Sequence, residues 1–221
     1  MSYKKLLYVA VFFAAAAIVA GYLTKGDYPP LRNGDLVFQT SRDPESLAIL
    51  AATTSLYSHV GIVEKTPSGD KVIEAANVVR ENPLSRWIKQ GVLGRMAIYR
   101  YKNLTDAQAN QIVAAATHYD GTPYDPYFSF KSTNIYCSKL PYLAYKDAGL
   151  SAGTLQNFAE LHMDNFLVRD LIEKRRRQFQ GCADKDFTQC YDYILHQPVI
   201  SPAAIARDPH FEEIYSNYTP F

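Results

Sequence analysis

Two short apolar segments joined by a turn are the feature that most limits how this chain can fold. Residues 59–63 and 71–75 are rich in valine and isoleucine, and residues 66–69 between them combine threonine, proline, serine and glycine. This pattern predicts a β-hairpin. With the turn at 66–69, His59 falls opposite Ala76, and Glu74 becomes its diagonal neighbour on the same face. A pairing shifted by one residue would place the two side chains on opposite faces.

Further strand and helix patterns follow in a mixed order. Residues 35–39 and 96–101 are expected to be strands, and residues 46–53, 106–119, 137–148 and 164–179 to be helices. Thr105 is a candidate N-cap and Gly149 a candidate C-cap. Residues 120–134, rich in glycine, proline and aromatic residues, are expected to form an ordered loop. Strands concentrate in the first half and helices in the second, which predicts an α+β fold with an antiparallel sheet packed against helices.

The N-terminal segment indicates where the protein works. Two lysines lie among the first five residues, and residues 6–20 contain no polar group except the hydroxyl of Tyr8. This layout is typical of an export signal. Small residues at Ala20 and Gly21 suit cleavage, whereas extension through Leu23 gives about 18 apolar residues, the lower limit of a membrane span. We expect residues 1–24 to be a signal peptide or a membrane anchor, and residues 25–221 to form one domain outside the cytoplasm.

Charge and cysteine content exclude several classes of protein. The chain has 23 Lys and Arg against 22 Asp and Glu, a net charge of +1, so there is no basic surface excess for nucleic acid. Three cysteines are too few for a disulfide scaffold and lack the paired spacing of a zinc site, and we expect neither metal nor cofactor. Cys182 and Cys190 enclose seven residues, and in an exported protein we expect them to form a disulfide rather than two free thiols. That pairing leaves Cys137 alone.

Cys137, His59 and Glu74 are the candidates for chemistry. Cys137 lies where a loop becomes a helix, and Pro141, tolerated only in a first turn, supports a helix start at about Cys137. A helix N-terminus favours a thiolate through its unpaired N–H groups and macrodipole. Glu74 interrupts an apolar strand and needs a partner, and a carboxylate beside His59 can hold the imidazole ready to accept the thiol proton. The alternatives are a half-buried structural histidine and a cysteine that only fills the core.

Five motifs resemble a known family. They are GDLVFQ at 34–39, SHVGIV at 58–63, VIEA at 72–75, YDGTPYD at 119–125 and IYCS at 135–138. Together they resemble the YiiX/YebB-like family of circularly permuted papain-like cysteine hydrolases, which is related to the NlpC-type peptidoglycan peptidases and to the lecithin retinol acyltransferases. The resemblance covers about residues 32–150 and extends more weakly from residue 199 to the C-terminus. The order is its specific part, because histidine and acid precede the cysteine, whereas the cysteine comes first in unpermuted enzymes.

The resemblance implies roles for five residues. Cys137 would be the nucleophile, His59 the base and Glu74 the residue that orients the base. Tyr136 and Tyr124 match tyrosines that flank the site and would take part in oxyanion or substrate binding. The backbone N–H of Cys137 would contribute to an oxyanion hole.

The expected function is an exported, periplasmic or membrane-anchored cysteine hydrolase that cleaves amide bonds through a thioester acyl-enzyme. Cell-wall peptides are the leading substrate class, on the strength of the relatives and the compartment. One alternative is an acyltransferase or a lipid or N-acyl hydrolase of the lecithin retinol acyltransferase type. Another is a peptide-binding domain without turnover, which the full set of three residues disfavours. Lys139 stands where the family commonly has an acidic residue, which leaves the local substrate preference open.

Overall fold

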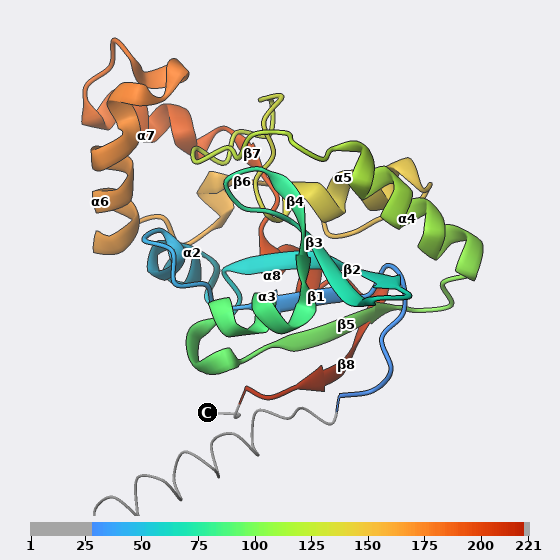
Figure 1. The fold of residues 1–221 in the computed structure, drawn as a ribbon. Helices are drawn as coiled ribbons and strands as arrows, with labels where there is room; N and C mark the ends of the chain where they lie inside the picture. Colours follow the sequence, from blue (N-terminus) through green and yellow to red (C-terminus); the bar gives the residue numbers. More distant parts are fainter. Residues whose placement is uncertain (1–27, 219–221) are drawn as a thin grey trace, which may run out of the picture. The chain divides into compact units, whose positions relative to one another are not determined.

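A computed structural model describes residues 28–218 of the chain (Figure 1). The N-terminal segment 1–24, expected to be a signal peptide or a membrane anchor, lies outside the described residues. Between residues 28 and 218, no helix has both the length and the apolar character that a membrane crossing needs.

A six-stranded antiparallel sheet forms the centre of the domain, in the spatial order β4-β3-β2-β1-β5-β8. Its strands are β1 Leu36–Gln39, β2 His59–Thr66, β3 Gly69–Ala75, β4 Val79–Pro83, β5 Ala97–Tyr101 and β8 Phe211–Ser216. Thr66 pairs with Gly69 and Ile62 with Ile73, so the predicted hairpin and its register are confirmed. The edge strands β4 and β8 were not predicted.

Helices and short turns surround the sheet and confirm the α+β fold class. The α-helices are α2 Ser46–Thr53, α3 Leu84–Gln90, α4 Asp106–His118, α5 Lys139–Asp147, α6 Phe166–Arg175, α7 Phe187–Leu195 and α8 Pro202–Ala206. Short 3-10 turns lie at η1 Val92–Gly94, η2 Phe158–Glu160, η3 Arg176–Gln178 and η4 Gln180–Cys182, and strands β6 Gln156–Asn157 and β7 Pro198–Val199 form a small second sheet.

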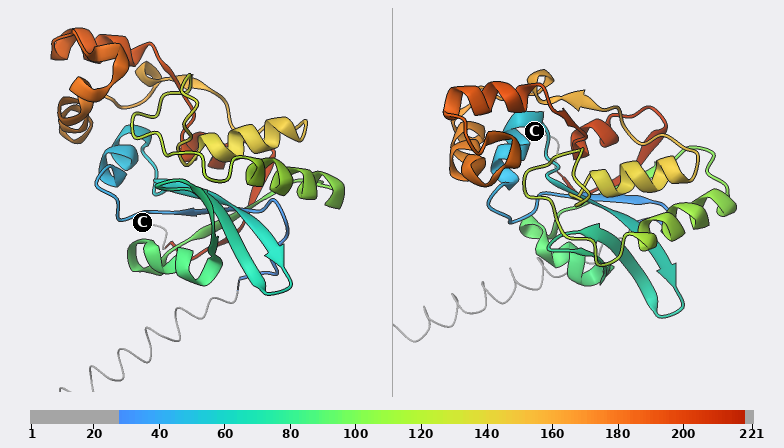
Figure 2. Two further views of the ribbon diagram at one scale, coloured as in Figure 1. Left: turned by 45° about the horizontal axis from the view of Figure 1, so that its top comes forward. Right: turned by 90° about the horizontal axis from the view of Figure 1, so that it is seen from above.

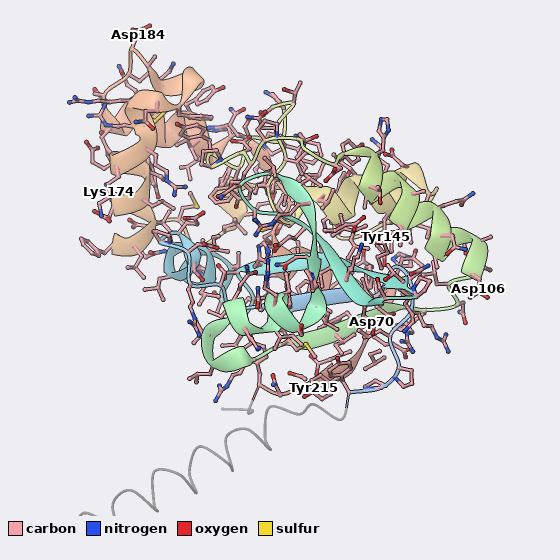
Figure 3. All side chains as sticks on the ribbon, in the orientation of Figure 1. Asp70, Asp106, Tyr145, Lys174, Asp184 and Tyr215 are labelled. Carbon is pink, nitrogen blue, oxygen red and sulfur yellow. A yellow bond between two sulfur atoms is a disulfide. The ribbon has the colours of Figure 1, made fainter. Side chains whose placement is uncertain are left out.

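The main core lies between one face of the sheet and helices α4 and α5. Val60 and Ile62 of β2 are fully buried there with Ile112 of α4 and Leu140 of α5. From α5, the hydroxyl of Tyr145, labelled in Figure 3, donates a hydrogen bond to the carbonyl of Gly34 at 2.5 Å. Strand residues alternate between faces, so His59 and Glu74 lie on the other face, where α3 packs (Figure 1).

The start of α5 differs from the prediction. The helix begins at Lys139, two residues after Cys137, and Cys137 lies in the preceding turn. The carbonyl of Tyr136 accepts hydrogen bonds from the backbone N–H groups of Lys139 and Leu140, which closes this turn just before the regular helix. Pro141 is the third helical residue, where its missing N–H costs no helical hydrogen bond. Cys137 therefore still precedes the N-terminus of α5.

Residues 158–195, here called the helical cap, form a second helical region. The helix expected over 164–179 is shorter, because α6 ends at Arg175 and a 3-10 turn follows. The segment around Cys182 and Cys190, for which no regular structure was expected, contains α7, whose N-cap Asp186 forms a capping box with Gln189. The predicted disulfide between Cys182 and Cys190 is confirmed and joins η4 to α7.

The helical cap packs against α2 rather than against the sheet. Ala48 and Ala52 of α2 share a buried cluster with Met163 and Val168 of the cap. Figure 2 shows α6 and α7 beside each other and next to α2, and in Figure 3 Lys174 and Asp184 mark this region. The buried cluster between α2 and the cap is therefore separate from the core between the sheet and helices α4 and α5.

Candidate active site

His59 and Glu74 form a buried pair across the hairpin. The Nε2 atom of His59 lies 2.8 Å from Oε2 of Glu74, and the two residues are 7% and 2% exposed. Gly61 lies two residues after His59 on β2, and a Cβ atom there would lie only 2.3 Å from Cγ1 of Val72. A glycine at this position therefore lets the two strands keep the pairing that brings His59 and Glu74 together.

The second oxygen of Glu74 is held by the neighbouring strand. Oε1 accepts hydrogen bonds from Nδ2 of Asn82 at 3.0 Å and from Nη2 and Nε of Arg80 at 3.2 and 3.3 Å. Burial acts to raise the pKa of Glu74, but the contacts with His59, Asn82 and Arg80 outweigh it and lower the pKa. Glu74 therefore stays ionised, with one oxygen directed at His59 and the other fixed by β4.

Cys137 completes the arrangement from the turn before α5. Its thiol is buried, with Sγ 3.7 Å from the carbonyl oxygen of Ser58, and it is in hydrogen-bond contact with the imidazole of His59. The backbone N–H of Cys137 has no hydrogen-bond partner among residues 28–218. An unpartnered N–H beside a thiol can stabilise a developing oxyanion.

The electrostatics of the site favour a charged imidazole. Burial acts to lower the pKa of His59, but the hydrogen bonds and negative charges of Cys137 and Glu74 raise it to about 10. At neutral pH the protonated imidazole then lies beside the ionised carboxylate of Glu74. Fully buried Trp87 of α3 stacks on the ring, with the ring centroids 6.0 Å apart, and further fixes its position.

The two tyrosines expected to flank the site differ in position. The Tyr136 hydroxyl accepts a hydrogen bond from the backbone N–H of Ile200 at 3.1 Å, inside the core, so that hydroxyl already serves the fold. The Tyr124 hydroxyl has no hydrogen-bond partner in residues 28–218. Burial and the negative charge of Cys137 raise the pKa of Tyr124 well above its ordinary value, so the hydroxyl stays protonated.

Lys139, two residues after Cys137, forms its hydrogen bonds away from the thiol. Its side chain is buried, and Nζ donates hydrogen bonds to the carbonyl oxygens of Ser132 and Asn134 at 2.5 and 3.0 Å. Burial lowers the pKa of Lys139. The lysine therefore ties the loop over residues 120–134 to the start of α5.

A cavity of about 110 Å³ opens beside Cys137. Its walls come from α2, the loop around Phe128, the helical cap and the segment from Val199 to Pro202. Within the described residues, no group of three or more His, Cys, Asp or Glu side chains is placed to hold a metal ion.

Sequence reasoning missed the residues that support the pair. Arg80 and Asn82 lie on β4 and Trp87 on α3, and neither element was expected. Val79 is followed by three polar residues, Arg80, Glu81 and Asn82, so no apolar/polar alternation marks this strand in the sequence. A third strand beside β3 would have placed Arg80 directly opposite Glu74, as the structure has it.

Comparison with known proteins identifies the family of this chain. Residues 30–215 match the family described as "permuted papain-like amidase enzyme, YaeF/YiiX, C92 family". The uncharacterized protein YiiX of Escherichia coli strain K12 is 28% identical over 192 residues, which are 86% of this chain and 89% of that protein. A crystal structure described as metalloprotein yiiX from Escherichia coli O157:H7 superimposes with a TM-score of 0.76 at 29% identity, covering 85% of this chain and 98% of the other.

Proposed function

The chain belongs to the C92 family of permuted papain-like amidases, and from this premise we propose that it hydrolyses amide bonds with Cys137 as its nucleophile. The observation that carries the proposal is the continuous contact from the Cys137 thiol through His59 to Glu74. A nucleophile, a base in contact with it and a third group that orients the base form the pattern of a papain-like hydrolase.

The proposed reaction has two halves. In the proposed resting state His59 already carries the proton of the thiol, Sγ of Cys137 bonds to the carbonyl carbon, and the C–N bond breaks as His59 gives its proton to the departing amine. Water then loses a proton to His59, attacks the thioester and releases the acid and the thiol. Glu74 keeps its charge throughout and holds the imidazole through Nε2. The other ring nitrogen is thereby left to serve the thiol.

Two groups are positioned to stabilise the oxyanion of each tetrahedral intermediate. The backbone N–H of Cys137 is one, because it has no partner within residues 28–218. We assign the hydroxyl of Tyr124 as the other, since it is protonated and without a hydrogen-bond partner in that range. Tyr136 is given a supporting role instead, because its hydroxyl is bonded to Ile200.

The compartment and the broad substrate class are part of the proposal. The disulfide between Cys182 and Cys190 is typical of an oxidising compartment and supports export. Cell-wall peptides stay a prediction based on relatives and compartment. The relative from Escherichia coli O157:H7 is described as a metalloprotein; among the described residues no group of three or more His, Cys, Asp or Glu side chains is arranged to hold a metal ion, and the proposed reaction is written without one.

The proposal is tested by trapping the acyl-enzyme. The full-length protein is mixed with an acyl p-nitroanilide, quenched in acid and analysed by mass spectrometry of its peptides. We expect a thioester on the peptide that carries Cys137, and no adduct and no p-nitroaniline release in Cys137→Ala. Release at the wild-type rate from Cys137→Ala would show that another group is the nucleophile.

A further inference from the structure

The cavity beside Cys137 has walls that are apolar almost throughout. Side chains from four separate parts of the chain meet there, among them Ile49 of α2, Phe128, Leu171 of α6 and Ile194 of α7. The thiol of Cys137 lies in the same wall. An apolar cavity that includes the proposed nucleophile can only serve a part of the substrate that lies next to the reacting carbonyl.

The serine and threonine hydroxyl groups in this wall are already engaged with the protein backbone. Thr53 donates to the carbonyl of Ile49 at 2.8 Å, and Ser138 donates to the carbonyl of Ile200 at 2.8 Å. The hydroxyl of Ser201 accepts from the backbone N–H of Ala204 at 3.0 Å. These three hydroxyl groups already form hydrogen bonds with the backbone, so they are poor hydrogen-bond partners for a ligand.

The two arginines in the wall are also engaged within the protein, each by a carboxylate and a backbone carbonyl. Arg175 lies 3.1 Å from a carboxylate oxygen of Glu45 and donates to the carbonyl of Pro126 at 2.7 Å. Arg176 lies 2.9 Å from a carboxylate oxygen of Glu173 and donates to the carbonyl of Lys185 at 3.1 Å. Neither arginine is therefore an obvious partner for a negatively charged group of a substrate.

A peptide and a hydrocarbon chain would fare differently in this cavity. Each buried peptide group that finds no hydrogen-bond partner weakens binding, because its hydrogen bonds to water are lost and not replaced. A hydrocarbon chain has no such groups and gains about 0.8 kcal/mol for each methylene removed from water. Peptides of the cell wall, with their carboxylates, are therefore poor occupants of this cavity.

We propose that the acyl part of the substrate is an apolar fatty acyl chain that lies in this cavity with its carbonyl carbon at Cys137. This inference rests on the proposed amidase function and names the substrate class, an N-acyl amide. Sγ of Cys137 bonds to the carbonyl carbon, the C–N bond breaks, and the proton from His59 leaves with the amine. Water then releases the free fatty acid and returns the thiol.

The test compares acyl chain lengths on one leaving group. The full-length protein is assayed with acetyl, butanoyl, hexanoyl and octanoyl p-nitroanilides. We expect kcat/KM to rise about fourfold per added methylene, about 0.8 kcal/mol each, until the chain fills the cavity. Equal kcat/KM for acetyl and octanoyl substrates would overturn the proposal.

A matched pair of variants on one helix locates the effect. Ala52→Phe places a phenylalanine ring at a buried position of α2 in the cavity wall, and Leu47→Phe places the same ring at a position of α2 that is 61% exposed. We expect Ala52→Phe to lower kcat/KM for the octanoyl substrate at least tenfold and for the acetyl substrate less than twofold. Leu47→Phe should change neither.

Iodoacetamide labelling of Cys137 separates this inference from the proposed function. Labelling that stays dependent on His59 in Ala52→Phe shows that the variant folds with an intact site. If Cys137 is labelled in this way but no substrate shows a chain-length preference, or none is cleaved, the fatty acyl proposal is wrong and the nucleophile stands. If labelling does not depend on His59 in the wild type, the proposed function itself fails.

Discussion

The hairpin site, which consists of His59, Glu74 and their partners on β4, and the wall of the cavity both lie next to the thiol of Cys137. They are stabilised by different kinds of interaction. In the hairpin site, both oxygens of Glu74 have directed partners, His59 on one side and Asn82 with Arg80 on the other. In the cavity wall, apolar side chains from α2 and the helical cap pack against one another without directed hydrogen bonds between them. Substitutions in the hairpin site should therefore change kcat, whereas substitutions in the cavity wall should change which acyl group is accepted.

The largest expected effect comes from removing the charge of Glu74. Glu74→Gln keeps the shape but leaves the imidazolium of His59 without its carboxylate, and we expect kcat to fall about 10²–10⁴-fold with little change in KM. The pKa of His59 should fall from about 10 towards its ordinary 6.5, which the pH profile of kcat measures. The control is Glu81→Gln on the same β4-β3 edge, where the carboxylate is exposed and pairs with Lys71. A similar loss of kcat in Glu74→Gln and Glu81→Gln would contradict a specific role for the Glu74 carboxylate.

The same pair sets a pH dependence of stability. The pKa of His59 is raised in the folded state, so its contribution is fully present below pH 6.5 and is lost as the pH rises through about 10. We expect the midpoint of urea unfolding to fall over this range in the wild type and to fall less in Glu74→Gln. A midpoint with the same pH dependence in both proteins would contradict the linkage.

A smaller effect is expected from the disulfide of the helical cap. Replacing both Cys182 and Cys190 by serine removes a cross-link over a sequence separation of 8, which costs about 2–3 kcal/mol in the chain-entropy account. We expect faster hydrogen exchange in α6 and α7 and a higher KM for octanoyl substrates, with iodoacetamide labelling of Cys137 unchanged. Loss of labelling would mean that the cap also holds the catalytic residues.

The smallest effect in this series concerns Asn82. Asn82→Ala removes one hydrogen bond to the charged oxygen of Glu74, while Arg80 keeps its two, so we expect kcat to fall about tenfold, about 1.4 kcal/mol. Gln90→Ala removes only the other partner of Asn82 and should change kcat less. A change confined to KM, or an equal loss in both variants, would argue against a positioning role through Glu74.

The two regions also differ in how far the sequence predicts them. The hairpin was predictable because a four-residue turn fixes the register, and the register alone places Glu74 diagonal to His59. The disulfide was predictable from compartment and cysteine count. Cys137 was assigned to a helix start, and it precedes α5 by two residues because the Tyr136 carbonyl closes a turn there.

Other elements depend on contacts that no local pattern carries. Strand β4 contains Arg80, Glu81 and Pro83, so its propensity is low, and it is a strand because it pairs with β3 at the sheet edge. The cavity is assembled from segments between Ala48 and Pro202 that are far apart in the chain. Its apolar character exists only once the helical cap has packed against α2.

The central claim is that His59 activates Cys137, and cysteine alkylation tests it most directly. The full-length protein and His59→Ala are treated with iodoacetamide at pH 6, and the rate of labelling is mapped to individual cysteines. We predict fast labelling of Cys137 in the wild type and a rate at least tenfold lower in His59→Ala, because the imidazolium stabilises the thiolate. Slow labelling that is the same in both proteins would contradict the account.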